Sequence, residues 1–162
     1  MFLATIDGCL QCGKCSHIVN RSHEISEIPV TFDENIFVTS IKKVTEEYLH
    51  TGKVEYRCEK CNYFHKEMQV KKQLLKAPEV LVLVLSRFKM ISPTIYTKLN
   101  NMVAFPERLD IKVGIAQDEG RVNYRLQAVI RHIGQNVETG HYVCEARRGD
   151  KCYVFDDSQV CT

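Results

Sequence analysis

The 162-residue sequence predicts an α+β domain that is mostly antiparallel β-sheet. In residues 124–131, apolar side chains alternate with mostly polar ones, which predicts one long strand with a single core face. Residues 141–146 and 152–157 are strand-like and flank the turn-forming dipeptide Gly149-Asp150, which predicts an antiparallel hairpin. One segment, residues 41–49, has the apolar stripe of an amphipathic helix.

The cysteines are the most unusual feature of the N-terminal part. There are 8 in the chain, and five of them form two tight clusters. A Cys-x-x-Cys turn points two thiolates at one ion, and two such turns supply the four sulfurs of a tetrahedral zinc site. The chain is also large enough to bury a core, which argues against a disulfide scaffold. The clustered cysteines are Cys9, Cys12, Cys15, Cys58 and Cys61.

Cys15 makes the choice of zinc ligands ambiguous, because it also lies two residues beyond Cys12. A metal knuckle favours a residue with positive φ after its second cysteine, and Gly and Asn adopt that conformation most easily. Gly13 and Asn62 satisfy this preference and Ser16 does so less well. The predicted structural zinc ligands are therefore Cys9, Cys12, Cys58 and Cys61, with Cys15 as a spare thiol.

The remaining elements follow in chain order. Residues 25–32 suit an edge strand, where Pro29 is tolerated. Thr39 and Ser40 can cap the helix and Gly52 can end it. Predicted strands at 54–56 and 64–75 flank the second cysteine pair. The apolar run 80–85 predicts a strand buried on both faces. Residues 98–110 are expected to be irregular to extended, and residues 134–140 to form a loop.

The C-terminal hairpin offers a histidine and a carboxylate. If its turn centres between Arg148 and Gly149, His141 faces Asp156 across the ladder, within hydrogen-bonding reach. A one-residue change of register would replace Asp156 by Asp157. Such a pair is either an ordinary surface contact or the orienting half of a nucleophile–His–Asp constellation.

Charge and hydropathy exclude some partners. The net charge of +2 gives no electrostatic reason to expect nucleic acid or anionic lipid as a partner. No apolar run approaches the length of a membrane span, and the first residues lack the pattern of a signal peptide. A thiolate zinc site is typical of a reducing compartment, so we expect an intracellular protein of the cytoplasm, the nucleus or both.

These motifs resemble the ubiquitin-specific proteases, papain-like cysteine peptidases that cleave ubiquitin from proteins. The resemblance covers nearly the whole chain. Its motifs are GCLQCGKCSHIV with YRCEKCN (zinc fingers), APEVLVLVLSRFKM and KLNNMVAFPERLDI (following strands), and YRLQAVIRHIGQNVETGHYVCEARRGDKCYVFDDSQV (His box).

The resemblance implies a zinc-bearing fingers part over 1–77 and a palm over 78–162, with ubiquitin or ubiquitinated proteins as partners. It also implies His141 as the catalytic base, Asp156 as the acid that orients it and Asp157 as the neighbouring position that can share this role. It supports the same four zinc ligands. His132-Ile133-Gly134 matches the family's His-x-Gly, either structural or substrate-facing.

Two departures affect the expected activity. Cys152 stands where the family usually has Trp, and no segment resembles the Cys box with the nucleophile and oxyanion donor. The implied fold is thus an incomplete papain-like fold without the helical thumb. Neither Cys144, Cys152 nor Cys161 is expected to replace the nucleophile. Three interpretations stay open: part of an active deubiquitinase that is inactive alone, an inactive ubiquitin-binding relative, or an unrelated zinc-binding interaction module.

Overall fold

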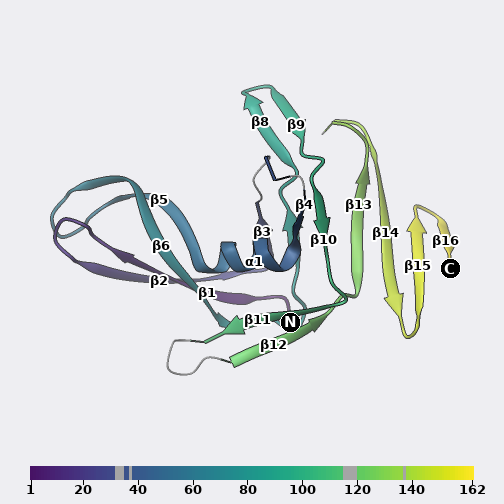
Figure 1. The fold of residues 1–162 in the computed structure, drawn as a ribbon, viewed down its shortest axis with the longest axis horizontal. Coiled ribbons are helices and arrows are strands. Elements are labelled where there is room, and N and C mark those ends of the chain that lie inside the picture. Colours follow the sequence, from purple (N-terminus) through teal and green to yellow (C-terminus); the bar gives the residue numbers. More distant parts are fainter. Residues whose placement is uncertain (32–34, 37, 115–119, 137) are drawn as a thin grey trace.

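The structure is a computed structural model that describes residues 1–31, 35–36, 38–114, 120–136 and 138–162. Strands predominate within these ranges, and a single helix, α1, packs among them (Figure 1). All strand pairs but two are antiparallel there, so the predicted α+β, mostly antiparallel class is confirmed. None of the described helical residues forms a helix long and apolar enough to cross a lipid bilayer.

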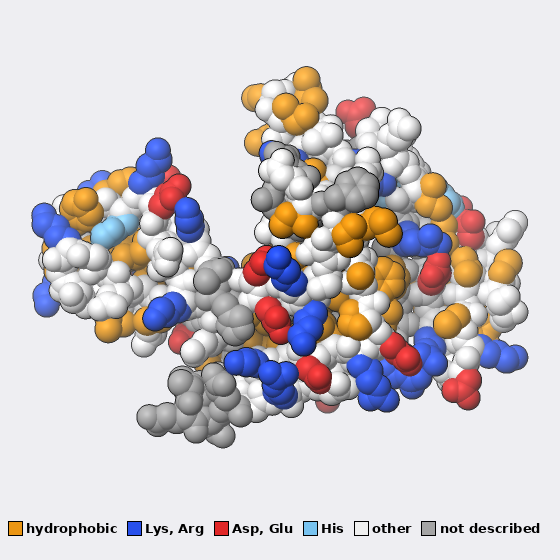
Figure 2. Space-filling model, in the orientation of Figure 1, with side chains coloured by type: hydrophobic (Ala, Val, Ile, Leu, Met, Phe, Trp, Pro, Cys, Tyr) orange, Lys and Arg blue, Asp and Glu red, His pale blue; other side chains and the backbone are white. Residues whose placement is uncertain are grey.

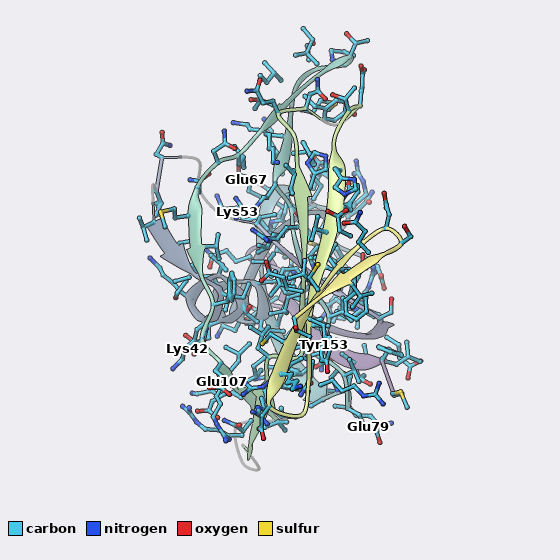
Figure 3. All side chains as sticks on the ribbon, turned by 90° about the vertical axis from the view of Figure 1, so that its right-hand side faces the viewer. Lys42, Lys53, Glu67, Glu79, Glu107 and Tyr153 are labelled. Atoms are coloured by element: carbon cyan, nitrogen blue, oxygen red, sulfur yellow. The ribbon has the colours of Figure 1, made fainter. Side chains whose placement is uncertain are left out.

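The first sheet, here called the finger sheet, projects away from the rest of the molecule (Figure 1). Its strand order is β2-β1-β6-β5 and all its pairs are antiparallel. An ion pair of 2.8 Å joins Lys53 to Glu67 across two of these strands, and Figure 3 shows both side chains. The strands are β1 (Ala4–Gln11), β2 (Ile18–Ile25), β5 (Thr51–Arg57) and β6 (Phe64–Lys76).

Helix α1 (Ile41–His50) lies at the base of the finger sheet (Figure 1). The Ser40 hydroxyl accepts a hydrogen bond from the Lys43 amide at 3.3 Å, as expected of an N-cap. The helix ends at His50, and β5 begins at the next residue. Gly52 therefore lies within β5 and does not end the helix as predicted.

The main core forms where the helix, the finger sheet and the strand pair β11–β12 meet. Ile6, Val44, Leu74 and Ile111 are among its buried residues. The N-terminal and C-terminal halves share this core. The described residues also form four two-stranded pairs: β3 (Ile28–Val30) with β7 (Leu83–Leu85), β4 (Val38–Ser40) with β10 (Met102–Ala104), β8 (Phe88–Ser92) with β9 (Ile95–Lys98), and β11 (Arg108–Val113) with β12 (Gly120–Arg125).

Two strand predictions need correction. The apolar run 80–85 is not a doubly buried strand, because only β7 is extended there and Val80 and Val84 are 42% and 39% exposed. The alternating segment 124–131 is not one strand either. It is interrupted at Leu126 and Gln127, where the chain passes from the β11–β12 pair into the next sheet.

The C-terminal sheet carries the predicted histidine and carboxylate. Its strands pair in sequence order, and all pairs are antiparallel. The face opposite His141 is apolar and exposed, with Ile130 72%, Tyr142 63%, Phe155 42% and Val160 57% exposed. The strands are β13 (Ala128–Ile133), β14 (His141–Arg148), β15 (Lys151–Asp156) and β16 (Gln159–Cys161).

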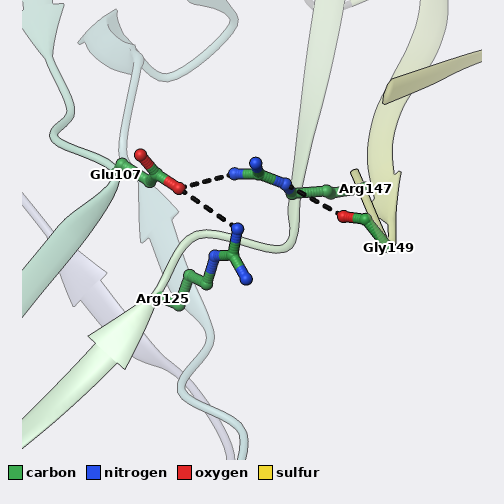
Figure 4. A network of polar contacts seen from close by, with 4 residues as sticks. All are labelled: Glu107, Arg125, Arg147 and Gly149. Atoms are coloured by element: carbon green, nitrogen blue, oxygen red, sulfur yellow. Dashed lines mark hydrogen bonds and ion pairs between the residues drawn. The ribbon is translucent and has the colours of Figure 1, made fainter. Parts of the chain in front are cut away.

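A carboxylate ties this sheet to the neighbouring strand pair. Glu107 accepts a 2.6 Å hydrogen bond from Arg147 and forms an ion pair with Arg125 at 3.3 Å (Figure 4). The Arg147 guanidinium also donates to the Gly149 carbonyl at 3.2 Å. The Arg147 hydrogen bond and the charges of both arginines lower the pKa of Glu107. The turn of the β14–β15 hairpin is thereby anchored to the loop that precedes β11.

The hairpin β8–β9 is the other prominent projection of the molecule (Figure 1). Met90, Ile91, Ile95 and Tyr96 near its tip are 49% to 64% exposed. Figure 2 shows apolar side chains gathered over this tip.

Candidate functional site

Four cysteine sulfurs converge at the tip of the finger sheet. Cys12 and Cys15 follow β1, and Cys58 and Cys61 follow β5. All four sulfurs lie within 4.8 Å of one another, with 3.7 Å between Cys12 and Cys61 and 3.6 Å between Cys15 and Cys58. A tetrahedral ion with metal–sulfur bonds of about 2.3 Å separates its sulfurs by roughly 3.8 Å. The arrangement therefore fits a four-thiolate metal site.

The two Cys-x-x-Cys turns have the same backbone geometry. The Ser16 amide donates to the Cys12 carbonyl at 2.8 Å, and the Asn62 amide donates to the Cys58 carbonyl at 2.8 Å. Ser16 and Asn62 are both left-handed, with φ of 57° and 55°. Two matching turns at the ends of two hairpins thus present their sulfurs to one point.

The structure corrects one predicted ligand. Cys9 lies within β1, opposite Asn20 and Lys71, and is not part of the cysteine group. Within β1, Cys9 lies on the face opposite to Leu10, which is buried with Cys12 in the finger-tip cluster. Cys15 takes the place assigned to Cys9, while the other three predicted ligands are in the group.

Gly13 favours the 9–12 pair in the sequence, because glycine adopts a positive φ most easily. A left-handed conformation at an ordinary L-residue costs only about 1–2 kcal/mol. The closed turn and its 2.8 Å hydrogen bond hold Ser16 in that conformation nonetheless. The position of the turn could have identified Cys15. The 12–15 pair lies in the turn of its hairpin, as the 58–61 pair does, whereas Cys9 lies in the strand before the turn.

His65 of β6 is a member of this site that the sequence did not reveal. Its Nε2 lies 3.3 Å from the Cys12 sulfur, and its ring packs edge-on against Tyr63 at 4.8 Å between centroids. This hydrogen bond lowers the pKa of the Cys12 thiol to about 5. A thiolate at Cys12 accepts the bond and His65 donates it. The sequence offers no signal beyond a histidine in a strand next to a knuckle.

His141 and Asp156 form the second site. The ring Nε2 and the Asp156 carboxylate are hydrogen-bonded, and both side chains are half-exposed. This hydrogen bond, then the charge of Asp156 and that of Asp157, raise the pKa of His141. Asp157 has a φ of 49° in the turn between β15 and β16, and its carboxylate lies within 4.8 Å of the other two groups. The structure therefore brings all three predicted residues together.

The pair forms in a different register from the one predicted. Cys144 lies opposite Phe155 and Arg148 opposite Lys151, so the turn residues are Gly149 and Asp150. Relative to the prediction the ladder is shifted by two residues, and the contact between His141 and Asp156 is diagonal. A two-residue shift leaves every side chain on its original face, which is why the predicted partners still meet.

No described cysteine forms a hydrogen bond with His141. Cys144 is three residues along the same strand and points to the opposite face. Cys152 lies opposite Arg147, at the other end of the hairpin from His141, and Cys161 lies opposite Val154. Among the described residues, the paired His141 and Asp156 thus have no thiol hydrogen-bonded to them.

The fold and the two sites together define a β-rich domain with a carboxylate-paired histidine on a hairpin and a separate thiol-rich finger. The sequence model of the family described as "Ubiquitin carboxyl-terminal hydrolase" matches residues 1–162. The chain therefore belongs to the ubiquitin carboxyl-terminal hydrolase family, within the catalytic-domain region of the ubiquitin-specific proteases.

Individual relatives agree with this assignment. Mouse ubiquitin carboxyl-terminal hydrolase 17-like protein B is 33% identical over 155 residues, which cover 91% of this chain and 32% of that protein. Ubiquitin carboxyl-terminal hydrolase 4 of Arabidopsis thaliana is 30% identical over 154 residues, covering 93% and 41%. The chain thus spans less than half the length of these relatives.

Solved structures show the same fold. One of them is the SAGA Ubp8/Sgf11/Sus1/Sgf73 DUB module bound to ubiquitin aldehyde. A chain of that module matches 99% of this chain with a TM-score of 0.79 and 20% identity, and 37% of the module's chain is covered.

Proposed function

We propose that this chain contributes the fingers (1–77) and the palm (78–162) of a thiol-dependent deubiquitinase, which hydrolyses peptide and isopeptide bonds at the ubiquitin C-terminus. In this proposal His141 is the general base, Asp156 orients it, and Asp157 adds negative charge beside it. The hydrogen bond between His141 and Asp156, in a chain that matches the hydrolase family over its whole length, is the observation that carries the proposal.

The geometry of this pair defines the role of each ring nitrogen. An ionised carboxylate only accepts hydrogen bonds, so the His141 Nε2 donates to Asp156. In the neutral ring the lone pair is then on Nδ1, which is the atom available to accept a proton from a thiol. The imidazolium that forms is stabilised by the carboxylates of Asp156 and Asp157. The same nitrogen can return the proton to the leaving amine.

The nucleophilic thiol and the oxyanion donor are assigned to a part of the catalytic domain outside these 162 residues. This proposal rests on the positions of the chain's cysteines, four of which form the finger-tip group while none of the others is hydrogen-bonded to His141. We therefore expect the chain alone to be inactive. The alternative is a catalytically inactive relative that binds ubiquitin. The family match argues against an unrelated zinc-binding interaction module.

A fluorogenic substrate attached to the ubiquitin C-terminus tests this expectation. The purified chain and its His141→Ala variant should both release the fluorophore at the rate of buffer alone. Turnover by the chain that disappears in the variant would refute the expected inactivity and identify an unforeseen nucleophile. Titration of isotope-labelled ubiquitin with the chain tests binding separately, and shift changes at a defined surface are expected. Their absence at high concentration would contradict ubiquitin as a partner.

We further propose that the finger-tip group holds one structural zinc ion through Cys12, Cys15, Cys58 and Cys61. Four thiolates at these spacings are the ligand set typical of structural zinc, which closes the finger and takes no part in hydrolysis. Elemental analysis of reduced protein should give one zinc per chain. A value well below one would remove the assignment.

The proposed location is the cytoplasm, the nucleus or both. The eight cysteines are all free, and a thiolate metal site needs a reducing environment to persist. Fluorescence imaging of the tagged protein in cells tests this, and a signal confined to the secretory pathway would contradict it.

A further inference from the structure

Two residues at the base of the β8–β9 hairpin, Phe88 and Lys98, contact His132. Phe88 and Lys98 lie opposite each other in this hairpin. The Phe88 ring meets the His132 ring edge-on at 5.7 Å between centroids. The Lys98 ammonium lies 3.2 Å from the His132 Nδ1, 3.0 Å from the His132 carbonyl and 2.6 Å from the Gly134 carbonyl. One side chain thus joins the hairpin to the start of the 134–140 loop.

The chemistry of Lys98 determines which nitrogen of His132 carries the proton. An ammonium group has three hydrogens to donate and no lone pair to accept with. The three contacts of Lys98 use these three donors, so the His132 Nδ1 must be the acceptor. Neutral His132 therefore carries its hydrogen on Nε2.

The far edge of the His132 ring lies directly against Gly140. A Cβ at position 140 would be 2.0 Å from the His132 Nε2 and 2.8 Å from the Ile133 carbonyl oxygen, and neither distance is possible. Gly134 is confined similarly, because a Cβ there would be 2.7 Å from the Thr139 carbonyl. Gly134 and Gly140, at the two ends of the loop, therefore both lie in close contact with the His132 ring.

His141 directly follows Gly140, and Tyr142 directly follows His141. Tyr142 lies opposite His132 in the ladder, and their rings are 4.9 Å apart between centroids. The Gly140 backbone and the Tyr142 ring, on either side of His141, thus both contact the His132 ring. A rotation of the His132 ring would therefore change the contacts of the two residues that flank His141.

We propose that Lys98 is a positioning residue, which holds His132 as the Nε2–H tautomer against Gly140 and thereby couples the β8–β9 hairpin to the placement of His141. The word positioning rests on the proposed function, since it assumes that His141 is the base. The coupling itself is a property of the fold.

Nuclear magnetic resonance of the chain with ¹⁵N-labelled histidine tests the proposal. In the unmodified protein, His132 should show a protonated Nε2 and an unprotonated Nδ1. In Lys98→Met the tautomers of His132 should mix, and the titration midpoint of His141 should move toward the ordinary histidine value of about 6.5. Lys98→Arg, which restores donors at this place, should recover part of both effects. Lys151→Met removes an equal charge from the exposed first residue of β15 and should leave both signals unchanged.

Three results would overturn the proposal: a hydrogen on Nδ1 of His132 in the unmodified protein, an unchanged tautomer in Lys98→Met, or a changed tautomer with no change at His141. The first measurement needs no variant, so it decides the matter even if Lys98→Met does not fold. None of these measurements uses hydrolysis. Failure of the coupling and failure of the proposed function are therefore seen in separate experiments.

Discussion

Replacing Cys15 or Cys9 by serine separates the two possible ligand sets at the finger tip. The structure places the Cys15 sulfur 3.6 Å from that of Cys58, inside the four-sulfur group, and it places Cys9 in the ladder of β1. Cys15→Ser should therefore remove one of four metal ligands. Cys9→Ser changes one half-exposed side chain in a strand and leaves all four ligands in place.

The expected size of the effect follows from the number of ligands. Structural zinc sites of this kind bind with about 10–16 kcal/mol in total, so each of four ligands accounts for roughly 2.5–4 kcal/mol. Cys15→Ser should weaken zinc binding by about 10²- to 10³-fold, because every 1.4 kcal/mol is tenfold. Cys9→Ser should stay within about twofold of the unmodified chain, because an exposed substitution changes free energies by no more than ~0.5 kcal/mol.

Competition with a chromogenic zinc chelator measures this difference on both variants and the unmodified chain under reducing conditions. Cys15→Ser should lose its metal at chelator concentrations that leave the other two proteins loaded. The reasoning is refuted if Cys9→Ser loses zinc and Cys15→Ser keeps it. Equal zinc retention by both variants would equally contradict a four-sulfur site that contains Cys15.

Four further predictions concern neighbouring groups. His65→Phe should weaken zinc binding in the same competition assay by about 10- to 100-fold, the usual effect of losing a hydrogen bond to a metal ligand, and an unchanged affinity would contradict the donor role. Asp156→Asn should lower the pKa of His141, measured by its ¹H shifts, because the hydrogen bond to the carboxylate and then its charge raise that pKa, and both are removed; an unchanged midpoint would disprove the pairing. Since the folded-state pKa of His141 is raised, the stability from this pair should be complete below the unfolded value of about 6.5 and should be lost as pH rises through the folded value. Gly140→Ala should lower the thermal midpoint, because its Cβ would overlap His132, and a midpoint equal to that of the unmodified chain would show that the contact is not tight.

The sequence predicted correctly those elements that depend on residues close together in the chain. Ser40 caps the helix as expected, and the stripe of residues 41–49 is buried as the spacing indicated. The interruption at Leu126 and Gln127 was invisible, because the alternation of side chains continues through it in both strands. Only the partners of the two strands, β11 on one side and β14 on the other, reveal that the chain changes sheets there.

The same distinction applies to the candidate sites. His141 and Asp156 could be predicted as partners because the period of a strand preserves faces even when the register is two residues off. Cys15 could not be predicted as a member of the group from the residue that follows it, because the closed turn overrides the local preference of Ser16. His65 and Lys98 act on residues 53 and 34 positions away, and no pattern within a short segment can indicate such contacts.

The position of the cysteine group explains why the finger needs more than apolar contacts. The finger tip has its own small core, separate from the main one, and two of the six buried residues in it are the knuckle cysteines Cys12 and Cys58. The long strand β6 leads from this core to Leu74 in the main core. Because so few apolar side chains are available at the tip, a metal bound by four thiolates would supply the cross-link that fixes both hairpins to each other. The histidine site is supported differently, by the main body through Glu107 and by the β8–β9 hairpin through Lys98. Among the described residues, the contacts that support the two sites are therefore separate.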